Sequence, residues 1–241
     1  MLESNNDILY VVIPAYNEEE NIGDVVKEWH EVVSTIGSQS KLVVVNDGSK
    51  DSTLKKLTEL AVVFNQLIVL DKPNGGHGDT VVYGYKYAID HGATYVFQTD
   101  SDGQTRPAEF PQLWNVRDEY DIQLGFRKVR QDGFARWIVT KVLRIVILFQ
   151  FRTWITDANT PFRLMKVAPL SQLLEKIPKG YNLPNVLLTV MYKKEGYKYR
   201  FVKITFRPRQ GGVNSINIKS IAKIGQHAVK DFAHLSKSIF R

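Results

Sequence analysis

Residues 41–72, KLVVVNDGSKDSTLKKLTELAVVFNQLIVLDK, contain the strand–helix–strand pattern that decides the fold class. The runs KLVVVNDGS and QLIVLDK are apolar and rich in β-branched residues, which is typical of strands buried on both faces. Between them, DSTLKKLTELAVVF is interpreted as a helix, with Asp51 or Ser52 as its N-cap. Two buried strands joined by a helix indicate a parallel pair.

The same alternation continues on both sides of this unit. ILYVVIPAY is interpreted as a strand in which Pro14 prevents further pairing, and TYVFQTD as a fourth strand. Helices are expected in EEENIGDVVKEWHEVVSTIG and TVVYGYKYAIDHG. In the second half, YDIQLGFRKVR, TPFRLMKV and KYRFVKITFRPR suggest strands, while residues 132–155 and LSQLLEKI suggest helices. We therefore predict an α/β fold, with a mostly parallel sheet flanked by helices.

Composition restricts the chemistry. The chain of 241 residues has no cysteine, which excludes disulfides and thiolate metal sites and fits a reducing compartment. Its net charge of +7 favours a polyanionic partner such as nucleic acid, anionic lipid or a phosphorylated substrate. The start MLESNNDILYVVIP lacks a basic region followed by a long apolar core, so no secretory signal is expected.

Four polar clusters follow the first four predicted strands, and they are Tyr16–Glu18, Asn46–Ser49, Gly75–Asp79 and Asp100–Asp102. Ligands of parallel α/β sheets bind beyond the carboxyl ends of the strands, so these clusters are expected to meet at one edge. In extended backbone, Asp100 and Asp102 would share one face and repel each other. A cation between them, Mg²⁺ or Mn²⁺ for such hard oxygen ligands, would relieve this repulsion.

Four segments, VIPAYNEEENI, VVVNDGSKDST, GGHGDTVVYGYKYA and VFQTDSDGQTRPAEF, occur in this order. Together they resemble the inverting family 2 glycosyltransferases of the GT-A (Rossmann-like) fold, in particular the dolichyl- and polyprenyl-phosphate sugar synthases. The resemblance covers about residues 8–215. It implies a metal-dependent hexosyltransferase that uses a UDP- or GDP-sugar and a dolichyl or undecaprenyl phosphate acceptor. It also implies peripheral association with the cytoplasmic face of the membrane.

The resemblance implies roles on the donor side. Base and ribose would be held by Pro14, Tyr16, Glu18 and Asp47. The metal would be ligated by Asp102 and Asp100, and Asp100 would also contact the nucleotide or sugar. Gln104 matches a further position near the metal. Two departures from the family pattern stand out. Asn46 replaces the first of two consecutive acids, and His77 occupies a position where relatives often carry lysine.

On the acceptor side, GFRKVRQDGFARWIVT, TDANTPFR and RQGGVNS are similar to segments of polyprenyl-phosphate transferases. The resemblance implies that the acceptor phosphate is faced by Arg127, Arg130, Arg136, Arg163 and Arg209. Asp157 would lie near the reacting centre, and Arg127, Arg136 and Arg163 would act with it. Here Pro161 replaces a usual glycine and Asn214 a usual serine. The rival interpretation is a saccharide or other hydroxyl acceptor in cell-surface glycan synthesis, for which Asp157 would be the general base.

Two segments have two interpretations each. WIVTKVLRIVILFQFRTWI (137–155) is too rich in cations for a membrane-spanning helix, so it is either a buried helix or one lying in a lipid headgroup layer. Residues 216–241 have the pattern of a basic amphipathic helix, packed on the domain or lying on a membrane. We expect one glycosyltransferase domain over residues 1–215. Its nucleotide-sugar half is about 8–109 and its acceptor half about 110–215.

Other function classes fit the sequence less well. A nucleic-acid-binding protein would explain the charge, but no RNP-like motif, zinc spacing or helix-turn-helix pattern is found, so no nucleic-acid partner is expected. The glycines of NGGHGD do not have the G-x-G-x-x-G spacing of a nicotinamide-dependent oxidoreductase. The sequence alone does not exclude that the chain is a catalytically inactive relative of the transferases.

Overall fold

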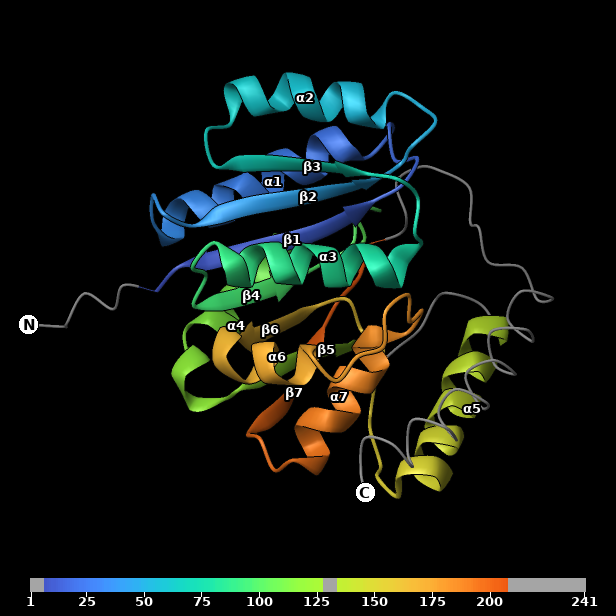
Figure 1. Ribbon diagram of the computed structural model, residues 1–241. Coiled ribbons are helices and arrows are strands. Elements are labelled where there is room, and N and C mark those ends of the chain that lie inside the picture. Colours follow the sequence, from blue (N-terminus) through green and yellow to red (C-terminus); the bar gives the residue numbers. More distant parts are fainter. Residues whose placement is uncertain (1–6, 128–133, 208–241) are drawn as a thin grey trace, which may run out of the picture.

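The computed structural model describes residues 7–127 and 134–207, and within them seven strands form one sheet in the order β3-β2-β1-β4-β6-β5-β7 (Figure 1). The strands are β1 (Leu9–Ala15), β2 (Lys41–Asp47), β3 (Leu67–Lys72), β4 (Tyr95–Gln98), β5 (Ile122–Arg127), β6 (Arg163–Lys166) and β7 (Tyr199–Ile204). The helices are α1 (Ile22–Ile36), α2 (Thr53–Val63), α3 (His77–Asp90), α4 (Pro111–Trp114), α5 (Phe134–Phe151), α6 (Val167–Leu174) and α7 (Pro184–Lys194). Two short 3₁₀ turns, η1 (Pro107–Glu109) and η2 (Arg117–Glu119), flank α4.

The sheet is mostly parallel, as predicted. β1 pairs in parallel with β2 and β4, β2 with β3, and β5 with β7, whereas β6 runs antiparallel to both β4 and β5. The strand–helix–strand unit of residues 41–72 is confirmed as β2, α2 and β3. The α/β fold class is therefore confirmed, and the carboxyl ends of β1 to β4 lie at one edge.

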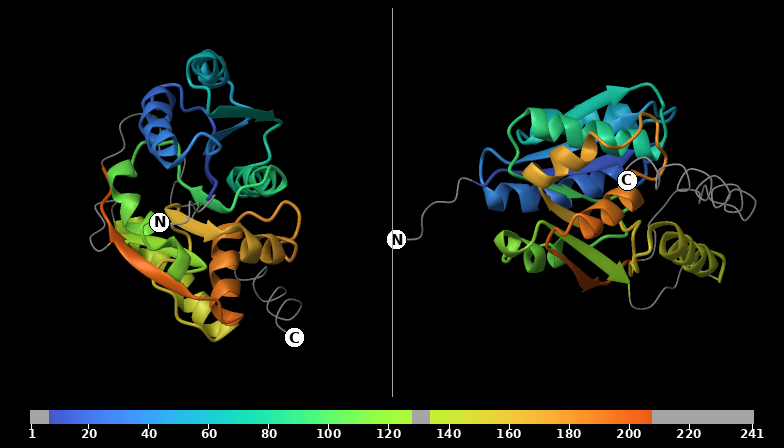
Figure 2. Two further views of the ribbon diagram at one scale, coloured as in Figure 1. Left: turned by 90° about the vertical axis from the view of Figure 1, so that its left-hand side faces the viewer. Right: turned by 60° about the horizontal axis from the view of Figure 1, so that its bottom comes forward.

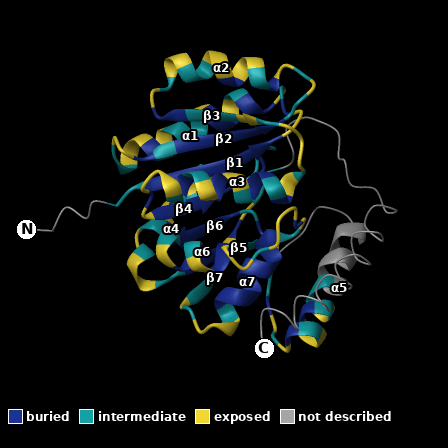
Figure 3. Cartoon of the chain, viewed as in Figure 1, coloured by how far each residue is buried: buried dark blue, intermediate teal, exposed yellow. Residues whose placement is uncertain are grey.

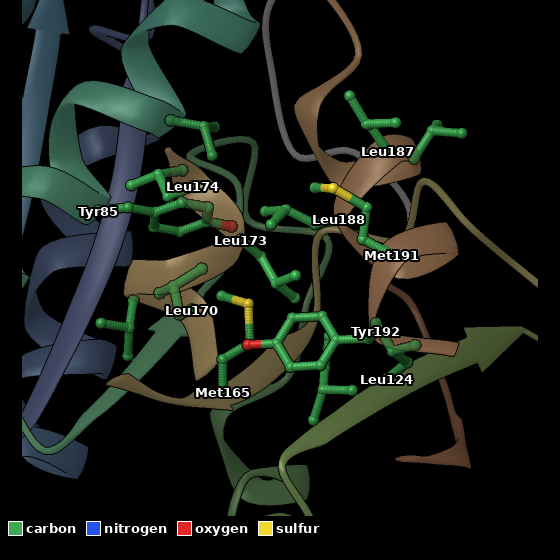
Figure 4. Packing of buried hydrophobic residues seen from close by; sticks show 14 of the residues in the cluster. Tyr85, Leu124, Met165, Leu170, Leu173, Leu174, Leu187, Leu188, Met191 and Tyr192 are labelled. Carbon is green, nitrogen blue, oxygen red and sulfur yellow. The ribbon is translucent and has the colours of Figure 1, made fainter. Parts of the chain in front are cut away.

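Helices cover both faces of the sheet (Figure 2). Alternate residues of β1 enter different cores: Val11 and Ile13 pack with α1, α2 and α4, while Tyr10 and Val12 pack with α3, α6 and α7. The central strands are accordingly buried along their length, and the exposed residues lie on the outer helices (Figure 3). Figure 4 shows α6, α7 and β5 joined by side chains of the second core, including Leu170, Met191 and Leu124.

Two strand ends differ from the predictions. Pro14 lies inside β1, where it pairs with Val45, because proline still offers its carbonyl to the neighbouring strand. β4 ends at Gln98, so Asp100 and Asp102 lie in a turn that Gly103 closes at a φ of 68°. The argument that the two aspartates share one face of a strand is therefore wrong, and their placement depends on the turn.

Helix α7 was not predicted from the sequence. Nine of its eleven residues are buried, so it has no polar face to produce the 3.6-residue periodicity of a surface helix. Pro184 occupies its first turn, where a missing N–H group costs nothing.

The expected helix over residues 216–241 lies outside the described residues, as does the acceptor loop at 209–215. In the part of the chain that the structure describes, no helix is long and apolar enough to cross a membrane.

The contact of α3 with the sheet gives a test of packing. A Cβ on Gly84 would clash with the Val12 side chain and lie 3.2 Å from Cγ2 of Val45. Gly84→Ala is therefore expected to lower the free energy of unfolding by about 1–3 kcal/mol, measured by urea denaturation. Gly23→Ala in α1, which meets nothing within 4 Å, is the control, and it should be neutral or stabilising by up to about 1 kcal/mol. Equal effects of both substitutions would contradict this packing.

Candidate active site

The loops after β1 and β2 are joined by reciprocal hydrogen bonds. The Asn17 amide donates to Ser49 Oγ at 3.0 Å, and the Lys50 amide donates to Asn17 Oδ1 at 2.8 Å. The Glu18 amide donates to Thr53 Oγ1 at 2.8 Å. The first two predicted polar clusters therefore form one rigid wall.

The side chains of this wall differ in exposure. Tyr16 is 44% exposed, whereas Glu18 is only 9% exposed and accepts a 2.7 Å hydrogen bond from Asn21 Nδ2. Pro14 is buried within β1. Of these three predicted donor contacts, Tyr16 therefore has the most surface to offer a ligand.

Asp47 joins the second cluster to the third. Its Oδ1 accepts from Lys72 Nζ at 2.6 Å and from the Gly75 amide at 2.8 Å, and its Oδ2 accepts from the Gly76 amide at 2.9 Å. Burial opposes ionisation of Asp47, but the Lys72 and Gly75 hydrogen bonds outweigh it and lower the pKa below the ordinary 3.8. The Asp47 carboxylate thus anchors the glycine loop that begins α3.

The fourth cluster lies at the tip of β4. Asp100 Oδ1 is 3.2 Å from His77 Nε2 at the start of α3, and it accepts a long 3.4 Å bond from Gln98 Nε2. Asp102 Oδ1 accepts from the Gln104 amide at 3.1 Å, which shapes the turn. The Gln104 side chain is largely buried. All four clusters therefore meet at the carboxyl edge, as the sequence predicted.

The donor set at this tip fits a hard divalent cation. Asp100 keeps a third of its side chain exposed, and Asp102 lies beside it in the same turn. Within residues 7–127 and 134–207, no group of three His, Cys, Asp or Glu side chains gathers as a complete metal site. Mg²⁺ needs no such cage, because it uses one or two carboxylates and completes its shell with phosphate oxygens and water.

His77 contacts the carboxylate of Asp100, whose charge a bound cation would neutralise. Its side chain is about half exposed, and its Nε2 lies 3.2 Å from Asp100 Oδ1. Burial lowers the pKa of His77, but the hydrogen bond and negative charge of Asp100 raise it by more. A protonated His77 would thus balance the charge of Asp100 in this structure.

Beneath the tip of β4 lies a buried polar network that the sequence analysis missed. Gln98 Oε1 accepts from Asn185 Nδ2 of α7 at 2.8 Å and lies 3.0 Å from the Tyr85 hydroxyl of α3. These three side chains are at most 2% exposed. The only sequence signal was a glutamine and an asparagine inside otherwise apolar segments, YVFQ and NVLLTV.

Arg163 continues this network toward the acceptor half. Its fully buried guanidinium donates to the carbonyls of Ala158 and Asn185 at 3.1 Å, and twice to that of Thr160 at 2.7 and 3.0 Å. Burial lowers the pKa of Arg163. In this structure the guanidinium of Arg163 does not reach the protein surface. We therefore assign it a positioning role for the loop that carries Asp157.

The remaining acceptor-side predictions are only partly covered. Asp157 is half-buried and directly precedes Ala158, whose carbonyl Arg163 holds. Arg127 ends β5 and Arg136 lies in α5, but their side chains are not described. Arg130 and Arg209 lie outside the described residues.

The Asp47 anchor yields a pH-dependent prediction. Asp47→Asn removes the charge beside buried Lys72 and weakens the loop contacts, so it should cost about 1–3 kcal/mol of unfolding free energy at pH 7. Because the folded-state pKa of Asp47 is lowered, its contribution is complete above the ordinary 3.8 and disappears as the pH falls through the folded value. Urea denaturation of both proteins at pH 7 and pH 3 measures this convergence.

The control is Asp24→Asn, because Asp24 is 71% exposed and 3.8 Å from Lys27. This surface pair should contribute less than about 0.5 kcal/mol at either pH. A stability loss for Asp47→Asn that is the same at both pH values would contradict the electrostatic account.

Comparisons with known proteins can now be placed on this geometry. The chain is 26% identical over 233 residues to an uncharacterized protein of Methanocaldococcus jannaschii, covering 92% of this chain and 98% of that one. It is 29% identical over 140 residues to the undecaprenyl-phosphate 4-deoxy-4-formamido-L-arabinose transferase of Klebsiella pneumoniae. That match covers 57% of this chain and 42% of the transferase, so the chain spans less than half of that relative.

Among solved structures, the chain is similar to glucosyl-3-phosphoglycerate synthase from Mycobacterium tuberculosis in complex with Mn²⁺ and UDP-glucose. The TM-score is 0.72 at 16% identity, covering 96% of this chain and 80% of the synthase. This likeness establishes the GT-A fold. The family model for glycosyl transferase family 2 matches residues 10–174, well over half of the chain. The chain therefore belongs to glycosyl transferase family 2.

Proposed function

We propose that this glycosyltransferase moves a sugar, with inversion, from a nucleoside diphosphate sugar to a polyprenyl phosphate. It would use Mg²⁺ or Mn²⁺ and act as a peripheral protein on the cytoplasmic face of a membrane. The observation that carries the proposal is the meeting of four polar clusters at one sheet edge, with Asp100 and Asp102 at its centre. The undecaprenyl-phosphate transferase of Klebsiella pneumoniae supports the acceptor class.

On the donor side, Asp100 and Asp102 would hold the metal beside the diphosphate, with Gln104 shaping their turn. A bound divalent cation stabilises the charge that develops on the departing nucleoside diphosphate. Tyr16, which is 44% exposed, would pack on the base, and Asp47, which binds the Gly76 amide, would hold the glycine loop beside it. The solved Mycobacterium tuberculosis synthase, which holds Mn²⁺ and UDP-glucose on the same fold, supports this arrangement.

On the acceptor side, the proposal assigns phosphate contacts to Arg127, Arg130, Arg136 and Arg209. Bidentate arginine contacts would position the acceptor oxygen for attack. A phosphate is already an anion near neutral pH, so it needs no strong base. Asp157, held in place through its loop by Arg163, would then orient groups around the reacting centre.

A second candidate acceptor is a small molecule with a hydroxyl group. It is favoured by the fold similarity to glucosyl-3-phosphoglycerate synthase, which has been solved with phosphoglyceric acid (TM-score 0.72). A hydroxyl acceptor has to lose a proton, so Asp157 would be its general base. The two candidates therefore make different demands on one carboxylate.

The donor site is tested by ligand-induced stabilisation. UDP- and GDP-sugars are added singly with Mn²⁺ or Mg²⁺, and the melting temperature is followed. A ligand at a hundred times its Kd should raise the melting temperature by about 5–10 °C, because it binds only the folded chain. Asp102→Asn should abolish the metal-dependent part of this shift.

The matched control is Asp90→Asn, because Asp90 is an exposed carboxylate at the far end of α3. It should shift like the unaltered protein. If no nucleotide sugar stabilises the protein, or if Asp102→Asn keeps the full metal-dependent shift, the proposed donor site is wrong.

The acceptor class is tested with Asp157→Asn. For a polyprenyl phosphate, kcat should fall by less than about tenfold, because no proton has to be removed. For a hydroxyl acceptor it should fall by about 10²–10⁴-fold, the usual contribution of a general base. Transfer of radiolabelled sugar to each acceptor measures both rates, with Asp90→Asn as control.

Donor-induced stabilisation of the Asp157→Asn protein has to match that of the unaltered protein for the rates to be compared. Transfer to phosphoglycerate or a saccharide alone, with a thousandfold loss in the variant, would establish the hydroxyl acceptor and refute the lipid phosphate.

A further inference from the structure

The second half of α5 is buried on one face and bare on the other. Ile147 and Phe151, one helical turn apart, are at most 1% exposed and pack into the core shared with α6 and α7. Ile145, Leu148 and Phe149, at the spacing of a single helix face, are 51%, 38% and 78% exposed. In its described part, the segment from 137 to 155 therefore has one face buried in the core, as a core helix would, and one exposed apolar face, as a helix lying on a membrane would.

Trp154 follows three residues after the helix end and is 56% exposed. We call Ile145, Leu148, Phe149 and Trp154 the α5 patch. In the described ranges, the other large exposed apolar side chains are Tyr16, Val62, Val63 and Tyr83, which lie in the loop after β1, in α2 and in α3. Scattered residues of this kind are ordinary, whereas a gathered patch marks an interaction site.

The charges around the α5 patch indicate what covers it. Residues 133–156 contain no Asp or Glu but four cations, Arg136, Lys141, Arg144 and Arg152. Arg144 lies within the helix turns that carry the patch, Arg152 directly follows the helix, and Lys193 Nζ donates to the Trp154 carbonyl at 2.6 Å. Apolar and tryptophan side chains bordered by cations match the headgroup layer of an anionic bilayer. Two copies of this face would instead bring like charges together.

The chain path places α5 at the active-site edge. β5 is linked to β4 through β6 by two antiparallel pairings, so β5 runs parallel to β4 and ends at the same edge as Asp100. β6 begins at that edge, and α5 lies in the connection between the two strands. Figures 1 and 2 show α5 standing out on the side where the parallel strands end.

We propose that the α5 patch inserts into the headgroup layer of an anionic membrane and thereby brings the carboxyl edge of the sheet to the lipid surface. This inference deepens the proposed function, since it names the surface that meets the acceptor's membrane. Vesicle binding needs no substrate, however, so its failure is distinguishable from a failure of transfer.

The test is co-sedimentation of the full chain with vesicles of phosphatidylglycerol and phosphatidylcholine. The unaltered protein should bind them and should bind pure phosphatidylcholine vesicles much more weakly. The double variant Phe149→Ser, Trp154→Ser should bind at least about tenfold more weakly, because burying even one apolar side chain of this size changes affinity by that factor. Both positions are exposed, so the fold should persist, and an unchanged melting temperature checks this.

The matched control is Val62→Ser, Val63→Ser at the end of α2, where the side chains are 86% and 73% exposed. It removes similar exposed apolar surface from a helix remote from α5 (Figure 1) and should leave vesicle binding unchanged. Quenching of tryptophan fluorescence by brominated lipid gives a second measurement. It should fall in Trp154→Phe, because this variant removes the tryptophan of the α5 patch, while Trp29 is buried in the core and Trp114 is partly buried.

Three results would overturn the inference. The first is no vesicle binding by the unaltered protein, and the second is equal binding by the double variant. The third is a dimer in light scattering that the double variant dissociates without any vesicle binding, which would make the α5 patch a contact between copies of this chain.

Discussion

The active-site edge depends on one buried cation, the guanidinium of Arg163. A charge removed from water is costly unless its donors are satisfied, and here four of its bonds go to backbone carbonyls. Those carbonyls belong to Ala158 and Thr160 of the loop before β6 and to Asn185 of α7. The same guanidinium therefore fixes the loop that carries Asp157 and the helix that supports it.

This cation also joins the two halves of the molecule. Gln98, the last residue of β4, is the register partner of Arg163, the first residue of β6. Asp100 lies two residues beyond Gln98, and Asp157 lies six residues before Arg163. The antiparallel junction thus places a carboxylate proposed for the donor and one proposed for the acceptor at the same edge of the sheet. Because β6 runs antiparallel to β4, the segment that precedes it, which carries Asp157, lies at the edge where β4 ends.

Much of this could be predicted from local sequence, and the reasons are physical. Apolar runs such as LVVV bury on both faces wherever they pair, so β1 to β3 and their polar ends could be predicted. The end of β4 at Gln98 could not be predicted, because it depends on pairing with β6, a strand more than 60 residues further along the chain. The turn that Gly103 closes then carries Asp100 and Asp102 away from the sheet. Nor could the burial of Arg163 be predicted, since the carbonyls that satisfy it come from residues up to 22 positions away. Helix α7 is buried almost all round, so its sequence lacks the 3.6-residue alternation of apolar and polar residues that would predict a helix.

The proposed membrane contact and the proposed acceptor require the same geometry. A polyprenyl phosphate keeps its chain in the bilayer, so its phosphate is confined to the headgroup layer. A transferase that binds this layer through the α5 patch need not extract the lipid, because the patch and Asp100 lie at the same sheet edge. A single half-helix buries little apolar area, so such binding would be reversible. Reversibility suits a transferase that must exchange a water-soluble nucleotide after each transfer.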